Sequence, residues 1–336
     1  MRFDLRQFRN SLFLVFTSSV FSLIIIELFC RLVIDDGMHY HLEMWKYAIN
    51  LKQISKNPEI GHEHLPNKKI RLMGVDVETN NFGLRDDWID KYPQEDVIRI
   101  LMLGDSITFG WGVESDKTIA KRLENSLSLN LNRKVEVINA GVGNYNTSMQ
   151  VEWFETVGLL FSPDIVLLNF FINDAEATPA YKEISFLDKY LYSKVIFLAG
   201  VDSAKRNFFG EKNWENYYRS LYSVDSSGWL DLKKSFLSMV EICKINDLPL
   251  IVLDYPEMRR LNPYPFKDIS KKIERLSVAN SVDYISLLPA IVSERPESLW
   301  VSVPDPHPNG YANKLISDFL TNELSQNPSI KYRLSK

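Results

Sequence analysis

The stretch IRILMLGDSITFGWG, residues 98–112, begins as an apolar run and then breaks at Gly104, Asp105 and Ser106. A short apolar run bounded by turn residues is typical of a strand that is buried on both faces of a sheet. Ser106 comes three residues after Leu103, where this strand is expected to end. Because ligands of parallel α/β sheets bind beyond the carboxyl ends of the strands, we expect Ser106 at the ligand-binding edge.

Short apolar runs alternate with helical patterns through the rest of the chain. The runs read as buried strands are 97–103, 135–138, 165–171 and 248–253, and apolar residues recur at helical spacing in 118–129, 148–160 and 230–245. Such alternation indicates a parallel sheet with helices on both faces. The predicted class is therefore α/β.

Composition narrows the class of protein. The chain has 336 residues, of which 45% are hydrophobic and 24% charged, as expected for a globular protein with a sizeable core. Its net charge is -4 and no run of Lys and Arg exceeds two residues, which excludes nucleic acid as a partner. The two cysteines, Cys30 and Cys243, are too few for a disulfide framework or a zinc site.

The N-terminal segment is apolar enough to cross a membrane. Residues 11–26 carry no charge, and the apolar stretch continues from Leu12 to Ile34, longer than the roughly 20 residues that a bilayer core requires. Glu27 and Arg31, one helical turn apart, are expected to pair. A cleaved signal peptide and a buried helix are the alternatives, but no small-residue cleavage site follows the run.

The charges that flank this segment predict its orientation. Arg2, Arg6 and Arg9 precede it, whereas Asp35 and Asp36 follow it. Basic residues stay on the cytoplasmic side of a membrane, so the N-terminus is expected in the cytoplasm and the rest of the chain outside the cell membrane, in the periplasm or the extracellular space.

The chain divides into three parts on this interpretation. Residues 1–34 form a cytoplasmic tip and transmembrane anchor, 35–95 a polar lead-in segment, and 96–330 the α/β domain. Within that domain, residues 175–229 are an insertion rich in Tyr, Phe and Trp. The insertion either lines a groove for a substrate or packs locally into the core.

A serine nucleophile requires a base, and one histidine is placed to supply it. His307 lies in a polar loop that also carries Asp305, just before an amphipathic helix. Acid and histidine together in a loop are typical of catalytic partners. Taken singly, Ser106 also fits a helix cap and His307 a solvated loop residue. The remaining histidines form two pairs with no supporting carboxylate or cysteine cluster, so no metal site is predicted; they are His39, His41, His62 and His64.

Two further strand exits offer donors for an oxyanion hole, the group of hydrogen-bond donors that stabilises a tetrahedral intermediate. Residues 139–147, NAGVGNYNT, form a glycine-rich exit with free backbone N–H groups. Asn173 follows the third strand and has a side-chain amide, although Asn173-Asp174 also fits an Asx turn. Residues 98–112 lack the Lys-Ser/Thr of a P-loop, and the second exit lacks the third glycine of a dinucleotide fingerprint.

Taken in order, these segments resemble the SGNH (GDSL-type) superfamily of serine hydrolases and related O-acyltransferases, over residues 79–323. The matching blocks are LMLGDSITFGWGV with nucleophile Ser106, VINAGVGNYNT, LLNFFINDAE with Asn173, and DPHPNGYANKLISDFL with His307. Three further segments resemble those of membrane-anchored members of this superfamily: the N-terminal span, NNFGLRDD and SLWVSVPDPHPN. The resemblance implies a three-layer α/β/α, flavodoxin-like fold.

Three positions depart from the family pattern. The usual oxyanion glycine is Asn144, preceded by Gly143, so the expected backbone donors are Ser106 N–H and that of Asn144 or Gly143. The usual Gly-x-Asn is Phe171-Ile172-Asn173. Asn tolerates a left-handed conformation better than most residues, so Asn144 can still present its N–H.

The third departure concerns the acid. The usual Asp three residues before the histidine is Pro304, which leaves Asp305 two before it. Pro306 and Pro308 favour extended backbone at Asp305 and His307, and side chains two apart on an extended segment point the same way. Asp305 is therefore predicted to orient His307, the alternative being a Ser106–His307 dyad without an acid.

The resemblance implies serine-dependent cleavage of an ester without metal or organic cofactor. With the domain outside the membrane, O-acyl groups of glycans are the expected substrates. An O-acetyltransferase that modifies an envelope or exported polysaccharide is the alternative, and a noncatalytic glycan-binding or assembly protein on the same scaffold is a second one.

Overall fold

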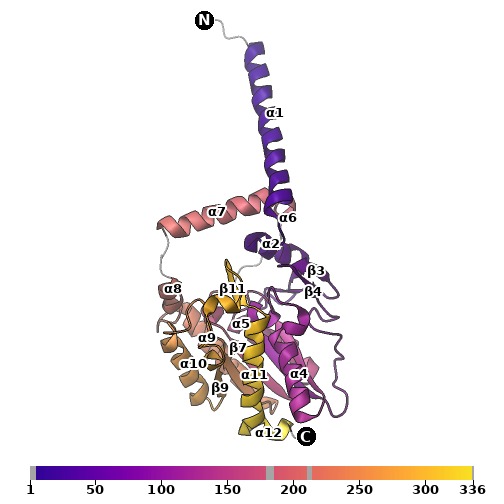
Figure 1. Cartoon of the computed structure of the whole chain (residues 1–336), viewed down its shortest axis with the longest axis vertical. Coiled ribbons are helices and arrows are strands. Elements are labelled where there is room, and N and C mark those ends of the chain that lie inside the picture. The colour runs from indigo at the N-terminus through magenta and orange to yellow at the C-terminus, as the bar shows by residue number, and fades with distance from the viewer. Residues whose placement is uncertain (1–4, 179–184, 210–213, 335–336) are drawn as a thin grey trace.

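A parallel sheet lies at the centre of the protein (Figure 1). The structure, a computed structural model, describes residues 5–178, 185–209 and 214–334. The five strands of the sheet are β5 (Ile98–Gly104), β6 (Val135–Gly141), β7 (Ile165–Phe170), β8 (Leu250–Asp254) and β9 (Asp283–Ser286). Their spatial order is β6-β5-β7-β8-β9, and each neighbouring pair is parallel. The predicted apolar runs correspond to the first four of these strands.

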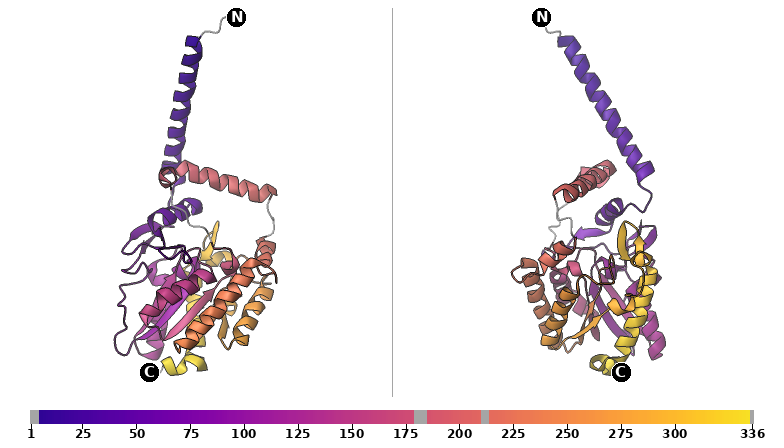
Figure 2. Two further views of the ribbon diagram at one scale, coloured as in Figure 1. Left: turned by 180° about the vertical axis from the view of Figure 1, so that it is seen from behind. Right: turned by 60° about the vertical axis from the view of Figure 1, so that its left-hand side comes forward.

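Helices cover both faces of the sheet, as Figure 2 shows from two sides. One face packs against α4 (Ile119–Leu131) and α11 (Gly310–Gln326), and the other against α5 (Thr147–Thr156), α9 (Ser227–Ile245) and α10 (Lys267–Ala279). All seven residues of β5 are buried, because their side chains alternate between the two apolar layers. The predicted three-layer α/β/α class is confirmed.

The strand register aligns three strand ends at one edge of the sheet. Gly104 of β5 pairs with Gly141 of β6, and Leu103 of β5 pairs with Leu168 of β7. Strands β6 and β7 lie on opposite sides of β5 in the sheet, so the connections that lead to them leave β5 in opposite directions. Loops after β5, β6 and β7 therefore meet beyond the middle of the sheet, where a crevice forms in such folds.

The lead-in segment, expected only as a polar stretch with turns, is a folded layer on the same edge. It contains helix α2 (Tyr40–Asn50), the pair β1 (Lys52–Ile54) and β2 (His62–His64), and the pair β3 (Lys69–Leu72) and β4 (Val75–Glu78), both antiparallel. Tyr47 and Leu72 pack with Phe109 and Trp111 of the domain in a small apolar cluster. The lead-in thus buries its apolar side chains against the loop that follows β5.

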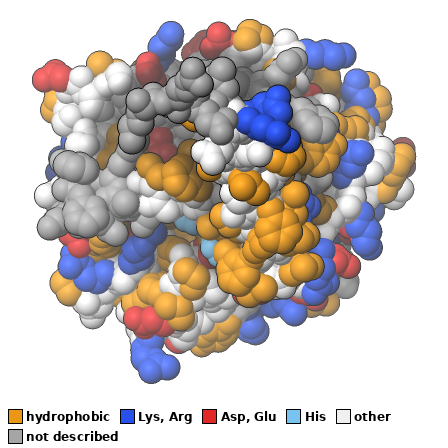
Figure 3. Space-filling view, turned by 90° about the horizontal axis from the view of Figure 1, so that it is seen from above, with side chains coloured by type: hydrophobic (Ala, Val, Ile, Leu, Met, Phe, Trp, Pro, Cys, Tyr) orange, Lys and Arg blue, Asp and Glu red, His pale blue; other side chains and the backbone are white. Residues whose placement is uncertain are grey.

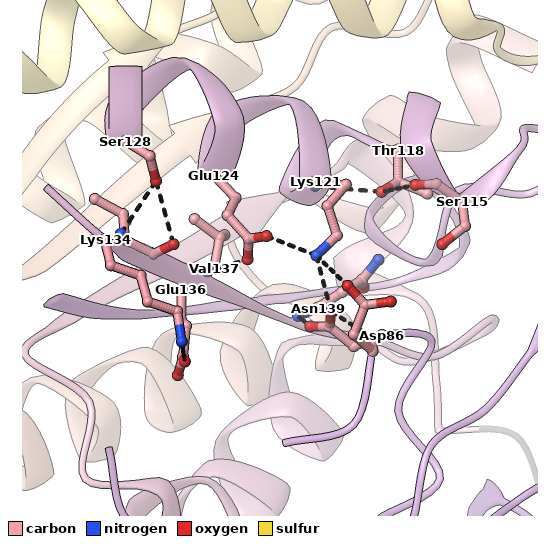
Figure 4. A network of polar contacts seen from close by, with 12 residues as sticks. Asp86, Ser115, Thr118, Lys121, Glu124, Ser128, Lys134, Glu136, Val137 and Asn139 are labelled. Atoms are coloured by element: carbon pink, nitrogen blue, oxygen red, sulfur yellow. Dashed lines mark hydrogen bonds and ion pairs between the residues drawn. The ribbon is translucent and has the colours of Figure 1, made fainter. Parts of the chain in front are cut away.

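A buried polar network fastens the end of the lead-in to the sheet (Figure 4). The Asp86 carboxylate accepts a hydrogen bond from the backbone N–H of Asn139 at 3.0 Å. Lys121 of α4 lies 3.7 Å from Asp86 and also binds Glu124 at 2.6 Å. Burial raises the pKa of Asp86 to about 6, which Lys121 and the Asn139 N–H oppose.

Helix α1 (Leu5–Phe29) projects from the body and ends in the π-helical turn Cys30–Ile34 (Figure 1). Among the described residues, one helix, Arg6–Ile34, is both long enough and apolar enough to cross a membrane. The most apolar part of this helix is not buried by the rest of the chain. A signal sequence has the same length and composition. Arg2, used above for orientation, lies outside the described residues.

The predicted insertion includes the helices α6 (Phe186–Tyr190), α7 (Tyr192–Phe209) and α8 (Trp214–Leu221) and the start of α9, and residues 179–184 and 210–213 of it lie outside the described chain. Helices α6 and α7 lie beside the base of α1, and α8 lies on the body (Figure 1). Tyr222, just after α8, is fully buried in the core, whereas Tyr218 lines the pocket described below. One tyrosine of this region is therefore part of the core, and another lines the pocket.

Candidate active site

A pocket of about 330 Å³ opens where the loops after β5, β6 and β7 meet. All six predicted site residues line it: Ser106, Gly143, Asn144, Asn173, Asp305 and His307. Aromatic side chains from four separate segments complete its wall, namely Tyr40, Trp111, Tyr218 and Tyr255. Figure 3 looks down on this side of the molecule and shows histidine within a hollow surrounded by hydrophobic side chains.

The serine stands at the start of a very short helix. Helix α3 (Ser106–Phe109) begins directly after β5, and the Asp105 carboxylate caps it by accepting the Ile107 N–H at 2.9 Å. The buried Arg85 guanidinium donates to the carbonyls of Phe109 and Gly110 behind this helix. A capped helix start and a clamped end fix the direction in which Ser106 leaves the strand.

The base and the acid lie on one extended segment. Strand β11 (Asp305–Pro308), which pairs with β10 (Trp300–Ser302), presents His307 Nε2 at 2.9 Å from Ser106 Oγ. His307 Nδ1 lies 2.5 Å from Asp305 Oδ1. A carboxylate can only accept, so Nδ1 carries the proton and the unprotonated Nε2 faces the serine hydroxyl. The three side chains form a continuous nucleophile–base–acid chain.

Trp111 supports the acid from behind. Its indole N–H donates to the other carboxylate oxygen of Asp305 at 2.8 Å, and Asp305 is fully buried. Burial raises the pKa of Asp305, but the hydrogen bonds from His307 and Trp111 outweigh it, so that the pKa lies below its usual value. Asp305 is therefore held as a carboxylate. Trp111 belongs to the stretch quoted at the outset, but sequence reasoning did not assign it a role.

The loop after β6 carries the predicted backbone donors. Asn144 has a left-handed backbone with φ +70°, which an Asn tolerates at low cost. Gly143 N–H donates to Tyr47 Oη at 2.9 Å and is therefore already engaged. In the part of the chain that the structure describes, the N–H groups of Asn144 and Ser106 have no hydrogen-bond acceptor. Of the two alternatives for this loop, Asn144 is the available donor.

Residues of the lead-in hold this loop through Gly143. Its carbonyl accepts from Lys52 Nζ at 2.6 Å and from His62 Nε2 at 3.0 Å. Lys52 also donates to the side-chain oxygen of Asn144 at 3.1 Å. A side chain on Gly143 has no room, because its Cβ would lie 2.8 Å from Cε1 of the Tyr47 ring. Close approach of Tyr47 therefore requires glycine here.

A directed chain of hydrogen bonds continues from Tyr47 into the lead-in. His64 Nδ1 lies 3.1 Å from the Gly83 carbonyl, which can only accept, so Nδ1 donates. His64 Nε2 then accepts from the Tyr47 hydroxyl at 2.6 Å, and the Tyr47 oxygen accepts from Gly143. Every member of the chain has a defined direction, so the Gly143–Asn144 loop is held in one conformation.

The two buried histidines of this network are kept uncharged at neutral pH. Burial, with the nearby charge of Lys52, lowers the pKa of His62 and of His64 to about 3. Burial lowers the pKa of Lys52 to about 7. Within the described residues, no three or more His, Cys, Asp or Glu side chains lie close enough together to hold a metal ion.

The predicted amide donor is positioned by the residue before the serine. Asn173 Nδ2 donates to Asp105 Oδ2 at 3.0 Å, and the other Asp105 oxygen caps α3. One Asp105 carboxylate thus orients both the nucleophile helix and the amide. Burial raises the pKa of Asp105, although bonds from Ile107 and Asn173 oppose the shift. Asn173 retains a second amide hydrogen for a ligand.

Comparison with known proteins agrees with this geometry. The GDSL-like lipase/acylhydrolase family matches residues 102–315, which include every predicted site residue. No curated protein matches the chain. Similar solved structures include a protein described as lipolytic and of the G-D-S-L family from Desulfitobacterium hafniense DCB-2, at 14% identity over 67% of this chain and 98% of that one, with a TM-score of 0.42.

Two other structures represent the range of similar proteins. A lipase/acylhydrolase from Enterococcus faecalis is 15% identical over 68% of this chain and 95% of that one, with a TM-score of 0.44. A two-domain esterase active on acetylated mannans is 14% identical over 71% of this chain and 50% of that one, with a TM-score of 0.40. Similarities of this degree do not identify a substrate.

Proposed function

Because the chain belongs to the GDSL-like lipase/acylhydrolase family, which consists of hydrolases acting on esters, we propose that it removes O-acyl groups from glycans with Ser106 as the nucleophile. The observation that carries this proposal is the unbroken chain from Ser106 through His307 to the buried carboxylate of Asp305, all lining one pocket. This geometry supports the role proposed below for each residue.

The first half of the reaction forms an acyl-enzyme. Ser106 Oγ attacks the ester carbonyl while His307 Nε2 takes the hydroxyl proton, which the 2.9 Å contact allows. The imidazolium that results lies against the Asp305 carboxylate, which keeps the tautomer and compensates the charge. His307 then returns the proton to the leaving sugar oxygen, and the acyl group stays on Ser106.

The oxyanion of the tetrahedral intermediate requires donors that are already in place. The backbone N–H groups of Ser106 and Asn144 and the free amide hydrogen of Asn173 supply three, from the ends of three adjacent strands. Each is held by a rigid support: α3 and its cap, the Tyr47–Lys52 network, and Asp105. Preorganised donors avoid the cost of reorientation during the reaction.

In the second half of the reaction His307 takes a proton from a water molecule, and the water oxygen attacks the acyl carbon. The bond to Ser106 Oγ then breaks, and His307 returns the proton to that oxygen. The same residues transfer the acyl group to a sugar hydroxyl if that hydroxyl occupies the place of the water. A wall of Tyr40, Tyr218 and Tyr255 offers apolar ring faces and hydroxyl groups, a combination that suits sugar rings. The aromatic wall supports a glycan as the substrate.

Hydrolysis and transfer can be separated in one experiment on the full chain in detergent micelles. We expect the protein to release p-nitrophenol and free acetate from p-nitrophenyl acetate, and acetate from acetylated glycans, with Ser106→Ala as the inactive control. Addition of a non-acetylated glycan should not produce an acetylated sugar detectable by mass spectrometry. Acetylated acceptor would instead establish the O-acetyltransferase alternative, and no release with any ester would favour the noncatalytic one.

We also propose that α1 anchors the protein in a cell membrane with its N-terminus in the cytoplasm. Arg6 and Arg9 precede the apolar stretch and Asp35 and Asp36 follow it, so the basic end is expected on the cytoplasmic side. The catalytic domain then lies on the outer side. No cleavage site for a signal peptidase follows the stretch, which supports an uncleaved anchor.

Protease protection tests this topology. In spheroplasts that express the full chain with an N-terminal epitope tag, we expect added protease to degrade the domain after Asp35 and to leave the tag with its first ten residues protected. A C-terminal tag on a second copy of the gene serves as the matched control and should be lost. Protection of the C-terminal tag in intact spheroplasts would reverse the topology, and absence of the N-terminal tag from mature protein would indicate a cleaved signal.

A further inference from the structure

Helix α7 lies across the base of α1, away from the body of the domain (Figures 1 and 2). Its first ten residues, Tyr192–Val201, form a short apolar segment. Apolar segments of this length belong to a buried core helix or to a segment at a membrane interface. The exposed fractions of Phe197, 68%, and Leu198, 52%, exclude the first of these.

Polar contacts fix the start of α7 to α1. The Glu27 carboxylate accepts hydrogen bonds from Tyr192 N–H at 3.1 Å, from Ser193 N–H at 2.9 Å and from Ser193 Oγ at 2.7 Å. The Arg31 guanidinium, paired with Glu27 at 2.7 Å, lies 4.3 Å from the centre of the Tyr192 ring. The one acidic side chain in this part of α1 therefore satisfies the first N–H groups of α7.

Helix α2 of the lead-in provides a second attachment. The Trp45 indole N–H donates to the Asp188 carbonyl of α6 at 2.7 Å, and its ring meets Tyr192 edge to face at 4.8 Å between centroids. Contacts with α1 on one side and with α2 on the other fix the position of α7 along the axis of α1. Helix α7 begins at the level of Glu27.

Glu27 lies near the outer edge of the expected bilayer core, in the last third of the apolar stretch that ends at Ile34. The uncharged residues 11–26 of α1 span about 24 Å at 1.5 Å per residue, against about 30 Å for a hydrocarbon core. Glu27 is the first charged residue after this stretch. A helix that starts there and runs across α1 lies along the membrane surface, and its apolar side chains can enter the boundary between headgroups and acyl chains.

We infer that α7 is an interfacial helix that rests in the outer surface of the lipid bilayer and turns the active-site pocket toward it. The hairpin β10–β11, which carries His307, points toward α7 from the body (Figure 1), and Val303 at its tip is 83% exposed. Figure 3, seen from this side, shows hydrophobic side chains gathered on the face from which α1 projects toward the viewer. Resting on the proposed esterase function, this orientation selects acylated glycans attached to or lying at the membrane.

Spin labels measure the depth of α7 directly and do not depend on activity. The full chain is reconstituted in nanodiscs of phosphatidylethanolamine and phosphatidylglycerol, with a nitroxide on Phe197→Cys or Leu198→Cys and, as control, on Leu129→Cys, an 83% exposed position of α4. The native Cys30 and Cys243 are buried. For each label we measure the ratio of its collision rate with oxygen to its collision rate with a water-soluble nickel complex. Because oxygen concentrates in lipid, we expect this ratio to be about tenfold higher at positions 197 and 198 than at position 129.

Two results would overturn the inference. Equal ratios at positions 197, 198 and 129 would show α7 in water, and exclusion of both probes from 197 and 198 would show it covered by protein, such as a second copy of the chain. A paired assay then tests the consequence for the substrate. Phe197→Ser/Leu198→Ser should lower the rate on an ester embedded in vesicles about tenfold and leave the rate on p-nitrophenyl acetate unchanged, whereas Leu129→Ser should change neither.

Equal rates of the double variant and the wild type on the vesicle ester would contradict the proposed orientation of the pocket. Failure of the proposed function has a different signature: the wild type itself would then hydrolyse neither ester, while the spin-label depths would still report where α7 lies.

Discussion

Ser106→Ala is expected to lower kcat on p-nitrophenyl acetate by about 10⁵- to 10⁶-fold, because the nucleophile acts as a unit with its base and its loss removes covalent catalysis altogether. Residual turnover should come from the oxyanion donors alone, which still bind the transition state. The Ser106 hydroxyl is hydrogen-bonded to His307, and alanine fits the first position of a helix, so folding should be unaffected.

The measurement pairs steady-state kinetics with thermal unfolding of the same preparation. Ser115→Ala is the matched control, because Ser115 is an exposed serine nine residues away and should keep wild-type kcat. A folded Ser106→Ala protein with kcat within tenfold of the wild type would remove Ser106 from the mechanism.

Asp305→Asn is expected to lower kcat on the order of 100- to 10,000-fold with the fold retained. The carboxylate accepts the His307 Nδ1 proton at 2.5 Å and so keeps Nε2 free to act as base. An amide in its place can present an N–H to Nδ1 and so favour the wrong tautomer. Asp305 is fully buried, so water cannot replace the lost acceptor. The Trp111 N–H also loses a charged partner.

Steady-state kinetics separate this account from a Ser106–His307 dyad. The expected change is in kcat, with KM close to that of the wild type, because the carboxylate acts through His307. Asp318→Asn, on the exposed face of α11, is the control and should be neutral. A kcat for Asp305→Asn within about threefold of the wild type would mean that the dyad works without an acid.

Local sequence patterns predicted the sheet and the strand ends well. The break after Leu103 coincides with the end of β5, and Ser106 begins α3 as expected from a strand exit. The pattern Asp305-Pro306-His307-Pro308 predicted an extended segment because two prolines restrict the residues before them, and β11 has that conformation. Such predictions succeed where neighbouring residues alone determine the backbone.

Edge elements without an apolar run were missed. Only one of the four residues of strand β9, Ile285, is buried, so neither a continuous apolar run nor a clear alternation marks this strand. The lead-in was predicted as a polar stretch, yet β1 and β2 place Lys52, His62 and His64 in buried positions. Polar residues at buried positions carry no signal in a hydrophobic pattern.

The supports of the site depend on contacts distant in sequence. Lys52 and Gly143 are 91 residues apart, and Tyr47 and Gly143 are 96 apart. Trp111 and Asp305 are 194 apart. No local spacing rule joins such pairs, so sequence reasoning reached the groups proposed to act on the substrate and missed the residues that hold them in place. Gly143 illustrates the difference: its N–H was one of two alternatives, with that of Asn144, for a donor to the oxyanion, and it donates to Tyr47.

Covalent labelling tests the serine mechanism most directly. The full chain is treated with a fluorophosphonate, which reacts with activated serine hydroxyls, and is then examined by intact-mass spectrometry and peptide mapping. We expect one adduct, on the peptide that contains Ser106, with none on folded Ser106→Ala and much slower labelling of Asp305→Asn. An unlabelled, folded wild-type protein, or an adduct that persists in Ser106→Ala, would contradict the assignment of Ser106 as the nucleophile.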